Sequence, residues 1–341
     1  MTISTRPAVL LVNLGTPDSP APADVRRFLR TFLTDRRVIE MHPMIWRPIL
    51  EGIILRTRPK ASGALYEEIW GEKSGAGVVG SPLMHWSLAQ TEALRTRLNG
   101  TADVFLAMRY SCPTVQDMLT KLQSLGYRQV LILPMYAQYS CTTVASIMDE
   151  VSRWLMESRN QIEIRTVRSF PDDPLYIDAL AAAIERTWDT QGRPDFSAGD
   201  KLLLSFHSIP QSMSDDGDPY VTECYTTASA LTQRLGIAGT DGVEVTFQSV
   251  FGPAQWVGPA TIDTVKKLGE SGTRRIDVIC PGFLADCLES VHEINILNRS
   301  EFVKAGGSNE GFTYIPWANA EPAFIDALEG QVRSHLAGWV N

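Results

Sequence analysis

Short hydrophobic runs alternate with longer amphipathic segments along most of the chain. The runs are rich in valine, isoleucine and leucine and end at turn residues, which is typical of strands buried in a parallel sheet. The segments between them carry apolar residues at helical spacing, so strands and helices alternate. This order predicts an α/β fold whose parallel sheets are covered by helices on both faces. Strands are expected at residues 8–13, 104–108, 130–133, 162–167, 202–205, 243–247, 276–279 and 312–315.

The same alternation runs through two halves of the chain. A chain of 341 residues is too long for one ordinary core and suits two. We therefore expect two Rossmann-like, doubly wound domains with a cleft between them. The first domain would comprise residues 1–150 plus 316–341, and the second would comprise residues 151–315. Helices are expected at residues 24–33, 61–70, 84–98, 113–125, 143–156, 174–188, 221–235, 261–268 and 322–336.

Composition narrows the class of protein. Hydrophobic residues make up 44% and charged residues 21%, as in soluble globular proteins, and the net charge of −8 argues against nucleic acid as a partner. We find no apolar run of about 20 residues that would span a membrane and no signal peptide. The five cysteines are scattered and odd in number, which suits a reducing compartment, so a cytoplasmic location is expected.

One segment, residues 41–55, is unusually apolar and is interrupted by Pro43 and Pro48. Two interpretations stay open. The segment is a core helix, or it is an exposed apolar lip over a pocket, suited to a greasy ligand or a bilayer surface. Three basic residues follow it directly: Arg56, Arg58 and Lys60.

A histidine ends one of the predicted strands. Three leucines run into Ser205, Phe206 and His207, and Pro210 stops the run. Ligands of open α/β sheets collect at the carboxyl ends of strands, and histidine ordinarily titrates near neutrality. His207 is therefore a candidate acid or base, the alternative being a structural cap on the strand.

A second strand end carries acidic residues. After residues 276–279, a turn leads into a helix expected to begin near Asp286, and Glu289 and Glu293 are four positions apart on one face of it. Asp286 is expected one turn earlier on the same side. These side chains form either a solvated acidic face or a row of carboxylates that passes on a hard divalent cation. The convergence of His207 and Glu289 from two strands favours a catalytic site.

Together these features resemble the ferrochelatases, enzymes that insert ferrous iron into a porphyrin to make haem. The resemblance runs nearly end to end and depends on the order and spacing of several motifs. They are LVNLGTP (11–17), RY (109–110), YAQYSC (136–141), SFHSIP (205–210), GDPY (217–220), QS (248–249), GP (252–253), Trp256 and GFLADCLESVHE (282–293).

The resemblance implies two Rossmann-like domains of the class II chelatase type, with the last helix packed on the first domain. It implies that His207 and Glu289 are the catalytic and metal-binding pair, with the division of roles between them open. Glu293 and Asp286 would extend the metal row. The porphyrin contacts it implies are Leu14, Arg56, Arg58, Lys60, Arg109, Tyr110, Tyr136, Ser249 and Trp256.

Some positions depart from the family pattern. Animal members carry histidine where this chain has Cys287, and Leu297 shortens the acidic row. One family cysteine is matched by Cys141, but no cysteine follows Cys287, so no iron–sulfur cluster and no tightly bound cofactor are expected. Ferrous iron would be a substrate.

The expected reaction is the last step of haem biosynthesis, the conversion of protoporphyrin IX to protohaem. Protoporphyrin is favoured over coproporphyrin because Leu14 and the lip are apolar. Alternatives are a coproporphyrin ferrochelatase, a cobalt or nickel tetrapyrrole chelatase, and a non-catalytic tetrapyrrole carrier. Peripheral contact with the inner face of the cytoplasmic membrane is expected, and the oligomeric state is left open.

Overall fold

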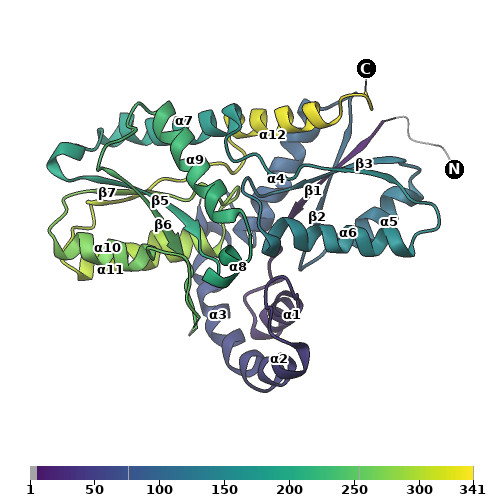
Figure 1. The fold of residues 1–341 in the computed structure, drawn as a ribbon, viewed down its shortest axis with the longest axis horizontal. Helices are drawn as coiled ribbons and strands as arrows, with labels where there is room; N and C mark the ends of the chain where they lie inside the picture. The colour runs from purple at the N-terminus through teal and green to yellow at the C-terminus, as the bar shows by residue number, and fades with distance from the viewer. Residues whose placement is uncertain (1–5, 76, 253, 341) are drawn as a thin grey trace. The chain divides into compact units, whose positions relative to one another are not determined.

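The computed structural model describes residues 6–75, 77–252 and 254–340 and forms two compact units (Figure 1). Unit 1 comprises Met1–Ser169 and Leu328–Asn341, and unit 2 comprises Phe170–Ala327. Pro253, part of one of the motifs above, lies outside the described residues, as do residues 1–5.

Unit 1 contains a parallel four-stranded sheet in the order β2-β1-β3-β4. Its central strand, β1 (Ala8–Asn13), is completely buried. On one face, apolar residues of β1 and β3 pack against α5 (Val115–Ser124) and α6 (Ser146–Glu157). The other strands are β2 (Asp103–Met108), β3 (Gln129–Pro134) and β4 (Glu163–Thr166).

The strand at residues 162–167 was predicted to belong to the second domain, and that prediction is wrong. β4 pairs in parallel with β3, with Glu163 opposite Gln129, so it is the edge strand of the first sheet. The physical reason is that α6 (Ser146–Glu157) packs on this sheet and Ile162 joins the same apolar cluster. Unit 1 accordingly extends to Ser169, beyond the expected boundary at residue 150.

The lip of residues 41–55 is helical from Pro43 onward, and its apolar side chains are partly buried and partly exposed. Leu50 and Leu55 are buried in a small cluster with Leu33, whereas Met44 is 80% and Ile45 60% exposed. Within the described part of the chain, none of the helices combines the length and apolar character that crossing a bilayer requires. The helical elements here are α2 (Pro43–Ile49), a π-helical turn (Leu50–Ile54) and α3 (Leu55–Ile69).

The remaining helical elements of unit 1 follow the predicted order, with ends shifted by a few residues. They are α1 (Pro22–Leu33), a 3₁₀ turn (Gly71–Ser74), α4 (Pro82–Arg97), α5 (Val115–Ser124) and the π-helical turn η3 (Cys141–Ala145) before α6.

Unit 2 contains a second parallel four-stranded sheet in the order β6-β5-β7-β8. The interior of β5 (Lys201–His207) is buried, and His207 is paired in register with Gln248 at the end of β6 (Val243–Gln248). The carboxyl ends of these strands therefore place polar residues side by side at one edge. The other strands are β7 (Ile276–Ile279) and β8 (Phe312–Tyr314).

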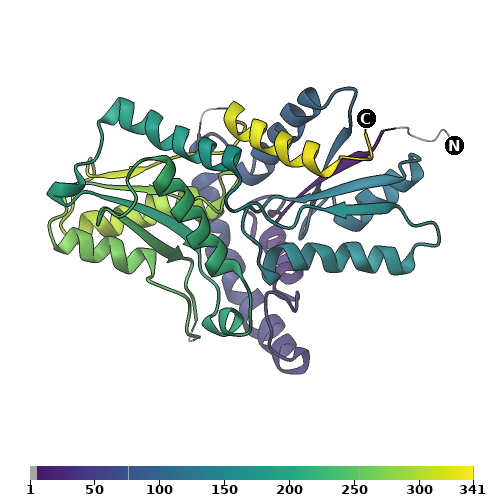
Figure 2. The same ribbon diagram turned by 45° about the horizontal axis from the view of Figure 1, so that its top comes forward.

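Helices cover both faces of this second sheet (Figures 1 and 2). Ile276 and Val278 face α10 and α11, while Asp277 between them accepts a hydrogen bond from Trp188 of α7 on the opposite face. The helical elements are α7 (Pro174–Gln191), η4 (Phe196–Ala198), α8 (Gln211–Asp215), α9 (Tyr220–Arg234), α10 (Thr261–Glu270), η5 (Leu288–Asn298) and α11 (Arg299–Lys304). The last helix, α12 (Pro322–His335), begins in unit 2 and belongs to unit 1 from Leu328 onward, so the expected return to the first domain at residue 316 was placed too early.

The acidic helix differs from its prediction in start and type. η5 is a π-helix that begins at Leu288, and Cys287 is its N-cap. The Cys287 backbone N–H donates to the Ser290 hydroxyl at 3.0 Å, which stabilises this start. Asp286 therefore lies before the helix, and its predicted place on the helical face of Glu289 is wrong.

Replacing Gly63 with alanine should destabilise unit 1, whereas the same change at Gly52 should not. A Cβ at Gly63 would lie 2.4 Å from the carbonyl oxygen of Pro20, so the backbone would have to move; such overpacking costs about 1–3 kcal/mol. A Cβ at Gly52 would meet no atom within 4 Å. Thermal unfolding should give Gly63→Ala a lower Tm and Gly52→Ala an unchanged or higher one. Equal Tm values would contradict the close approach.

Candidate active site

His207 ends β5 with its ring half-buried and its tautomer set by a backbone contact. Its Nδ1 lies 2.5 Å from the carbonyl oxygen of Ser208. A carbonyl oxygen only accepts hydrogen bonds, so Nδ1 carries the proton. In the neutral ring Nε2 then has the lone pair, which can accept a proton or bind a metal. Ser208 is itself held, since its N–H donates to the Gln248 carbonyl at 2.8 Å and its hydroxyl to the Val257 carbonyl at 2.7 Å.

The side chain of Gln248 connects three segments at this edge of the sheet. It is 2% exposed. Its Oε1 accepts from the Ser205 hydroxyl at 2.8 Å and from the Cys280 thiol at 3.5 Å. Its Nε2 donates to the carbonyl oxygen of Glu289 at 2.8 Å. The strand that carries His207 and the helix that carries Glu289 are thus tied to one buried amide.

Glu293 is oriented by Ser249. Its Oε1 accepts from the Ser249 backbone N–H at 2.6 Å, and its Oε2 accepts from the Ser249 hydroxyl at 2.5 Å. Ser249 has φ of 65°, a left-handed conformation uncommon for a residue other than glycine. This backbone turn directs both donors at the same carboxylate. Ser249, predicted to contact porphyrin, therefore has a carboxylate partner in the protein, and a porphyrin contact stays a prediction.

The carboxylates of the predicted metal row raise the pKa values of two buried cysteine thiols. Burial raises the pKa of Cys280, and the charges of Asp286, Glu293 and Glu289 raise it further. Burial likewise raises the pKa of Cys287, with the charge of Glu289 adding to the effect. The three carboxylates are therefore near enough to influence the same thiol. Among the residues that the structure describes, no group of three or more histidine, cysteine, aspartate or glutamate side chains gathers as a metal site.

Asp286 is buried and has several partners. Its Oδ1 accepts from the Ser290 hydroxyl at 2.8 Å and from the Tyr314 hydroxyl at 2.6 Å, and its Oδ2 accepts from Asn319 at 2.8 Å. Burial raises the pKa of Tyr314, and the neighbouring charge of Asp286 raises it further. A role for Asp286 as a metal ligand stays a prediction.

Two predicted porphyrin contacts of unit 1 form a buried polar cluster. Arg109 pairs with Asp35 at 2.6 Å and donates to the Ser146 hydroxyl at 2.7 Å. Tyr110, only 4% exposed, donates to Asp35 at 2.8 Å. Burial and the charge of Asp35 raise the pKa of Tyr110. Both side chains have partners within the unit, so a porphyrin contact by either remains only a prediction.

Three further predicted contacts are more open. Leu14 is half-buried directly after β1, and Tyr136 packs at the margin of the apolar core of unit 1. Trp256, in unit 2, is half-buried, its ring centroid lies 4.7 Å from that of Phe251, and its Nε1 donates to the Phe251 carbonyl at 2.8 Å. None of these contacts identifies a ligand by itself.

The three predicted basic contacts lie on α3, and all are exposed. Arg56 and Lys60 are four positions apart and share a face of the helix, whereas Arg58 points away from that face. Porphyrin contacts by these three residues stay predictions.

Sequence reasoning missed several residues that shape the site. Gln248 appeared only as part of a motif, and Tyr314 and Asn319 were given no role. Both contact Asp286 across a long stretch of chain, and neither stands in a pattern that indicates chemistry. Of the cysteines, Cys112 is exposed, Cys141 is half-buried, and Cys224, Cys280 and Cys287 are buried.

The fold is that of a chelatase. Over 98% of its length the chain is similar to SirB from Bacillus subtilis with Fe³⁺, with a TM-score of 0.57, 12% identity and 96% of that chain covered. It is also similar to the sirohydrochlorin chelatase SirB from Bacillus subtilis subspecies spizizenii in complex with cobalt, with a TM-score of 0.53, 11% identity and the same coverage. These similarities confirm the predicted fold class.

Sequence comparison gives the particular family. The profile described as Ferrochelatase matches residues 6–336. The protein named Ferrochelatase from Azoarcus sp. (strain BH72) is 45% identical over 339 residues, which cover 99% of this chain and 90% of that protein. The chain belongs to the ferrochelatase family. This confirms the resemblance that the motifs indicated and the assignment to a family of enzymes.

Proposed function

We propose that this protein inserts ferrous iron into protoporphyrin IX and releases protohaem. One Fe²⁺ replaces the two pyrrole protons of the free porphyrin, so two protons leave for each iron that enters. His207 carries the proposal: its Nδ1 proton is held by the Ser208 carbonyl, which leaves Nε2 as a base. It does so in a chain of the ferrochelatase family, whose acidic helix is tied to the same strand edge through Gln248.

His207, Glu289 and Glu293 have separate roles in the proposed reaction. His207 accepts the two pyrrole protons one after the other at Nε2 and releases each to solvent. Glu289 receives the ferrous ion, because a hard divalent cation prefers carboxylate oxygens. Glu293, oriented by Ser249, extends the negative field along the helix. Ferrous iron takes part as the substrate. We expect no iron–sulfur cluster, because no cysteine follows Cys287, and no other tightly bound cofactor.

Porphyrin binding uses charge at one edge of the ring and apolar surface elsewhere. Arg56 and Lys60, exposed on one face of α3, pair with the two propionates. Leu14, Tyr136 and Trp256 supply apolar surface. Protoporphyrin suits this arrangement because its other substituents are apolar.

We further propose that the protein acts in the cytoplasm and touches the inner face of the cytoplasmic membrane through the lip. Met41, Met44, Ile45 and Ile53 expose 46%, 80%, 60% and 58% of their surfaces. Apolar side chains beside basic residues are suited to an anionic bilayer surface.

Changing His207 to alanine should remove the group that accepts the pyrrole protons. Turnover of ferrous iron and protoporphyrin should fall at least about 100-fold, because the general base is lost. Added imidazole should restore part of it. Glu289→Gln should lower turnover and raise the KM for iron while leaving the KM for porphyrin unchanged.

The matched controls are His335→Ala in unit 1 and Glu310→Gln, which is exposed in unit 2. Both should turn over like the wild type when haem formation is followed anaerobically by its visible spectrum. Near wild-type turnover by a folded His207→Ala variant would overturn the proposed role of His207. A wild-type protein that binds porphyrin without forming haem would instead be a carrier.

Protoporphyrin should give a higher kcat/KM than coproporphyrin. Coproporphyrin carries two more propionates, and each buried carboxylate needs a cation or several hydrogen bonds to offset its desolvation. Parallel steady-state assays with the two porphyrins test this preference. A higher kcat/KM with coproporphyrin would overturn the proposal that protoporphyrin is the preferred substrate.

Polar substitution of the lip should weaken binding to vesicles. In the variant Met44→Gln with Ile45→Gln, cosedimentation with anionic phospholipid vesicles should fall several-fold, since binding scales with buried apolar area. Met156→Gln on α6 is the matched control, because Met156 is also 80% exposed. If both variants sediment with vesicles as the wild type does, the lip has no role in membrane contact.

A further inference from the structure

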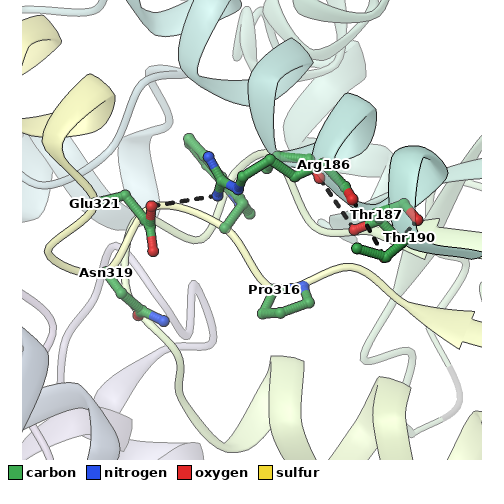
Figure 3. A pocket seen from close by; sticks show the side chains of 8 residues that line it. Arg186, Thr187, Thr190, Pro316, Asn319 and Glu321 are labelled. Carbon is green, nitrogen blue, oxygen red and sulfur yellow. Dashed lines mark hydrogen bonds and ion pairs between the residues drawn. The ribbon is translucent and has the colours of Figure 1, made fainter.

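A reciprocal pair of hydrogen bonds joins Asp286 to Asn319. The backbone N–H of Asp286 donates to Asn319 Oδ1 at 2.8 Å, and Asn319 Nδ2 donates to Asp286 Oδ2 at 2.8 Å. Asn319 lies between β8 and α12 and lines a surface hollow of about 270 Å³ that Arg186 and Glu321 also line (Figure 3). Glu321 pairs with Arg186 at 3.3 Å. The two hydrogen bonds with Asn319 fix both the main chain and the side chain of Asp286.

The backbone around Asn319 is shaped for this contact. Ala318 and Asn319 have φ values of 58° and 48°, two consecutive left-handed residues, neither of them glycine. Asparagine tolerates this conformation better than most residues, whereas alanine does not. Ala318 is 2% exposed, so the surrounding core holds the turn in place. Such strain persists where the local structure is over-determined, which is common beside functional sites.

The other oxygen of Asp286 faces the acidic helix. Asp286 Oδ1 accepts from the hydroxyl of Ser290, the residue directly after Glu289, and from the hydroxyl of Tyr314 at the end of β8. The Ser290 hydroxyl also receives the N–H of Cys287, the N-cap of η5. Asp286 thereby connects the first turn of η5 to a strand and to the turn that holds Asn319.

We propose that Asn319 is a positioning residue for Glu289 and acts through Asp286, whose carboxylate is a hydrogen-bond anchor and not a ligand of iron. The inference rests on the proposed function. Oδ1 accepts two hydrogen bonds and Oδ2 accepts one. A carboxylate offers about four lone-pair positions, so only one position, on Oδ2, is left for a cation. Glu289, one residue before Ser290, depends on this anchor for the position of its backbone.

An exchange of the two side chains tests the anchor directly. Asp286→Asn places an amide donor against the amide of Asn319, and Asn319→Asp places two carboxylates together. Either change should lower kcat at least about tenfold, with the KM for porphyrin unchanged, since a small misplacement of a reacting group has effects of this size. In the double variant the donor and acceptor are complementary again, with the charge moved to position 319. It should recover kcat to within about threefold of the wild type, because the two sites are coupled.

The outcomes separate an anchor from a ligand. If Asp286 binds iron, the double variant will be as slow as Asp286→Asn, and the proposal is overturned. Wild-type kcat in both single variants overturns it as well. Recovery of kcat in the double variant supports it. Urea unfolding of the same four proteins reads the coupling without turnover, so a wild type that forms no haem would defeat the proposed function while the anchor is still tested.

A milder variant covers the case in which the single changes do not fold. Tyr314→Phe removes one donor to Asp286, and Tyr127→Phe removes a similar bond, 2.7 Å long, to Asp103 in unit 1. The expected result is a loss of kcat by about threefold in Tyr314→Phe and none in Tyr127→Phe, with similar losses of stability, because each loses a hydrogen bond to a charged group. Equal kcat values in the two variants would overturn the proposal.

Discussion

The arrangement of the site in unit 2 depends on one buried amide. Gln248 is almost completely buried, so each polar atom of its side chain needs a partner in the protein. Ser205, Cys280 and the carbonyl of Glu289 supply those partners from three different segments. Gln248 ends β6 and is the register partner of His207 at the end of β5. Any shift of the acidic helix would therefore break a buried hydrogen bond beside the strand that carries His207.

His207 and Glu289 are both held in place by hydrogen bonds that involve backbone carbonyl oxygens. Gln248 holds the carbonyl of Glu289, and the Ser208 carbonyl holds Nδ1 of His207, so neither contact uses the Glu289 carboxylate or His207 Nε2. Glu293 is treated differently, since Ser249 binds both of its oxygens. On the proposed function, Glu289 is the carboxylate that handles iron and Glu293 contributes charge from a fixed position.

Strand positions were predictable where local sequence decides them. Residues 8–13 and 276–279 are continuous apolar runs, and they are strands with the predicted ends. β4 was assigned to the wrong sheet because its own residues do not indicate which strand it pairs with. Its partner is β3, and α6 separates the two strands in the sequence. His207 was found through its strand-end position. The pairing of Asp286 with Asn319 joins residues 33 positions apart. It also depends on a left-handed turn at Ala318 and Asn319, which the sequence does not indicate because neither residue is glycine.

The anchor also explains why a charged residue suits position 286. A buried carboxylate without partners costs several kcal/mol, and the hydroxyls of Ser290 and Tyr314 together with the amide of Asn319 offset that cost. The charge itself is not cancelled, since none of these partners is cationic. The charges of Asp286, Glu293 and Glu289 all raise the pKa of Cys280, in addition to the larger effect of its burial. On the proposed function, Asp286 therefore strengthens the attraction of a cation towards Glu289 while its own oxygens stay bonded to the protein.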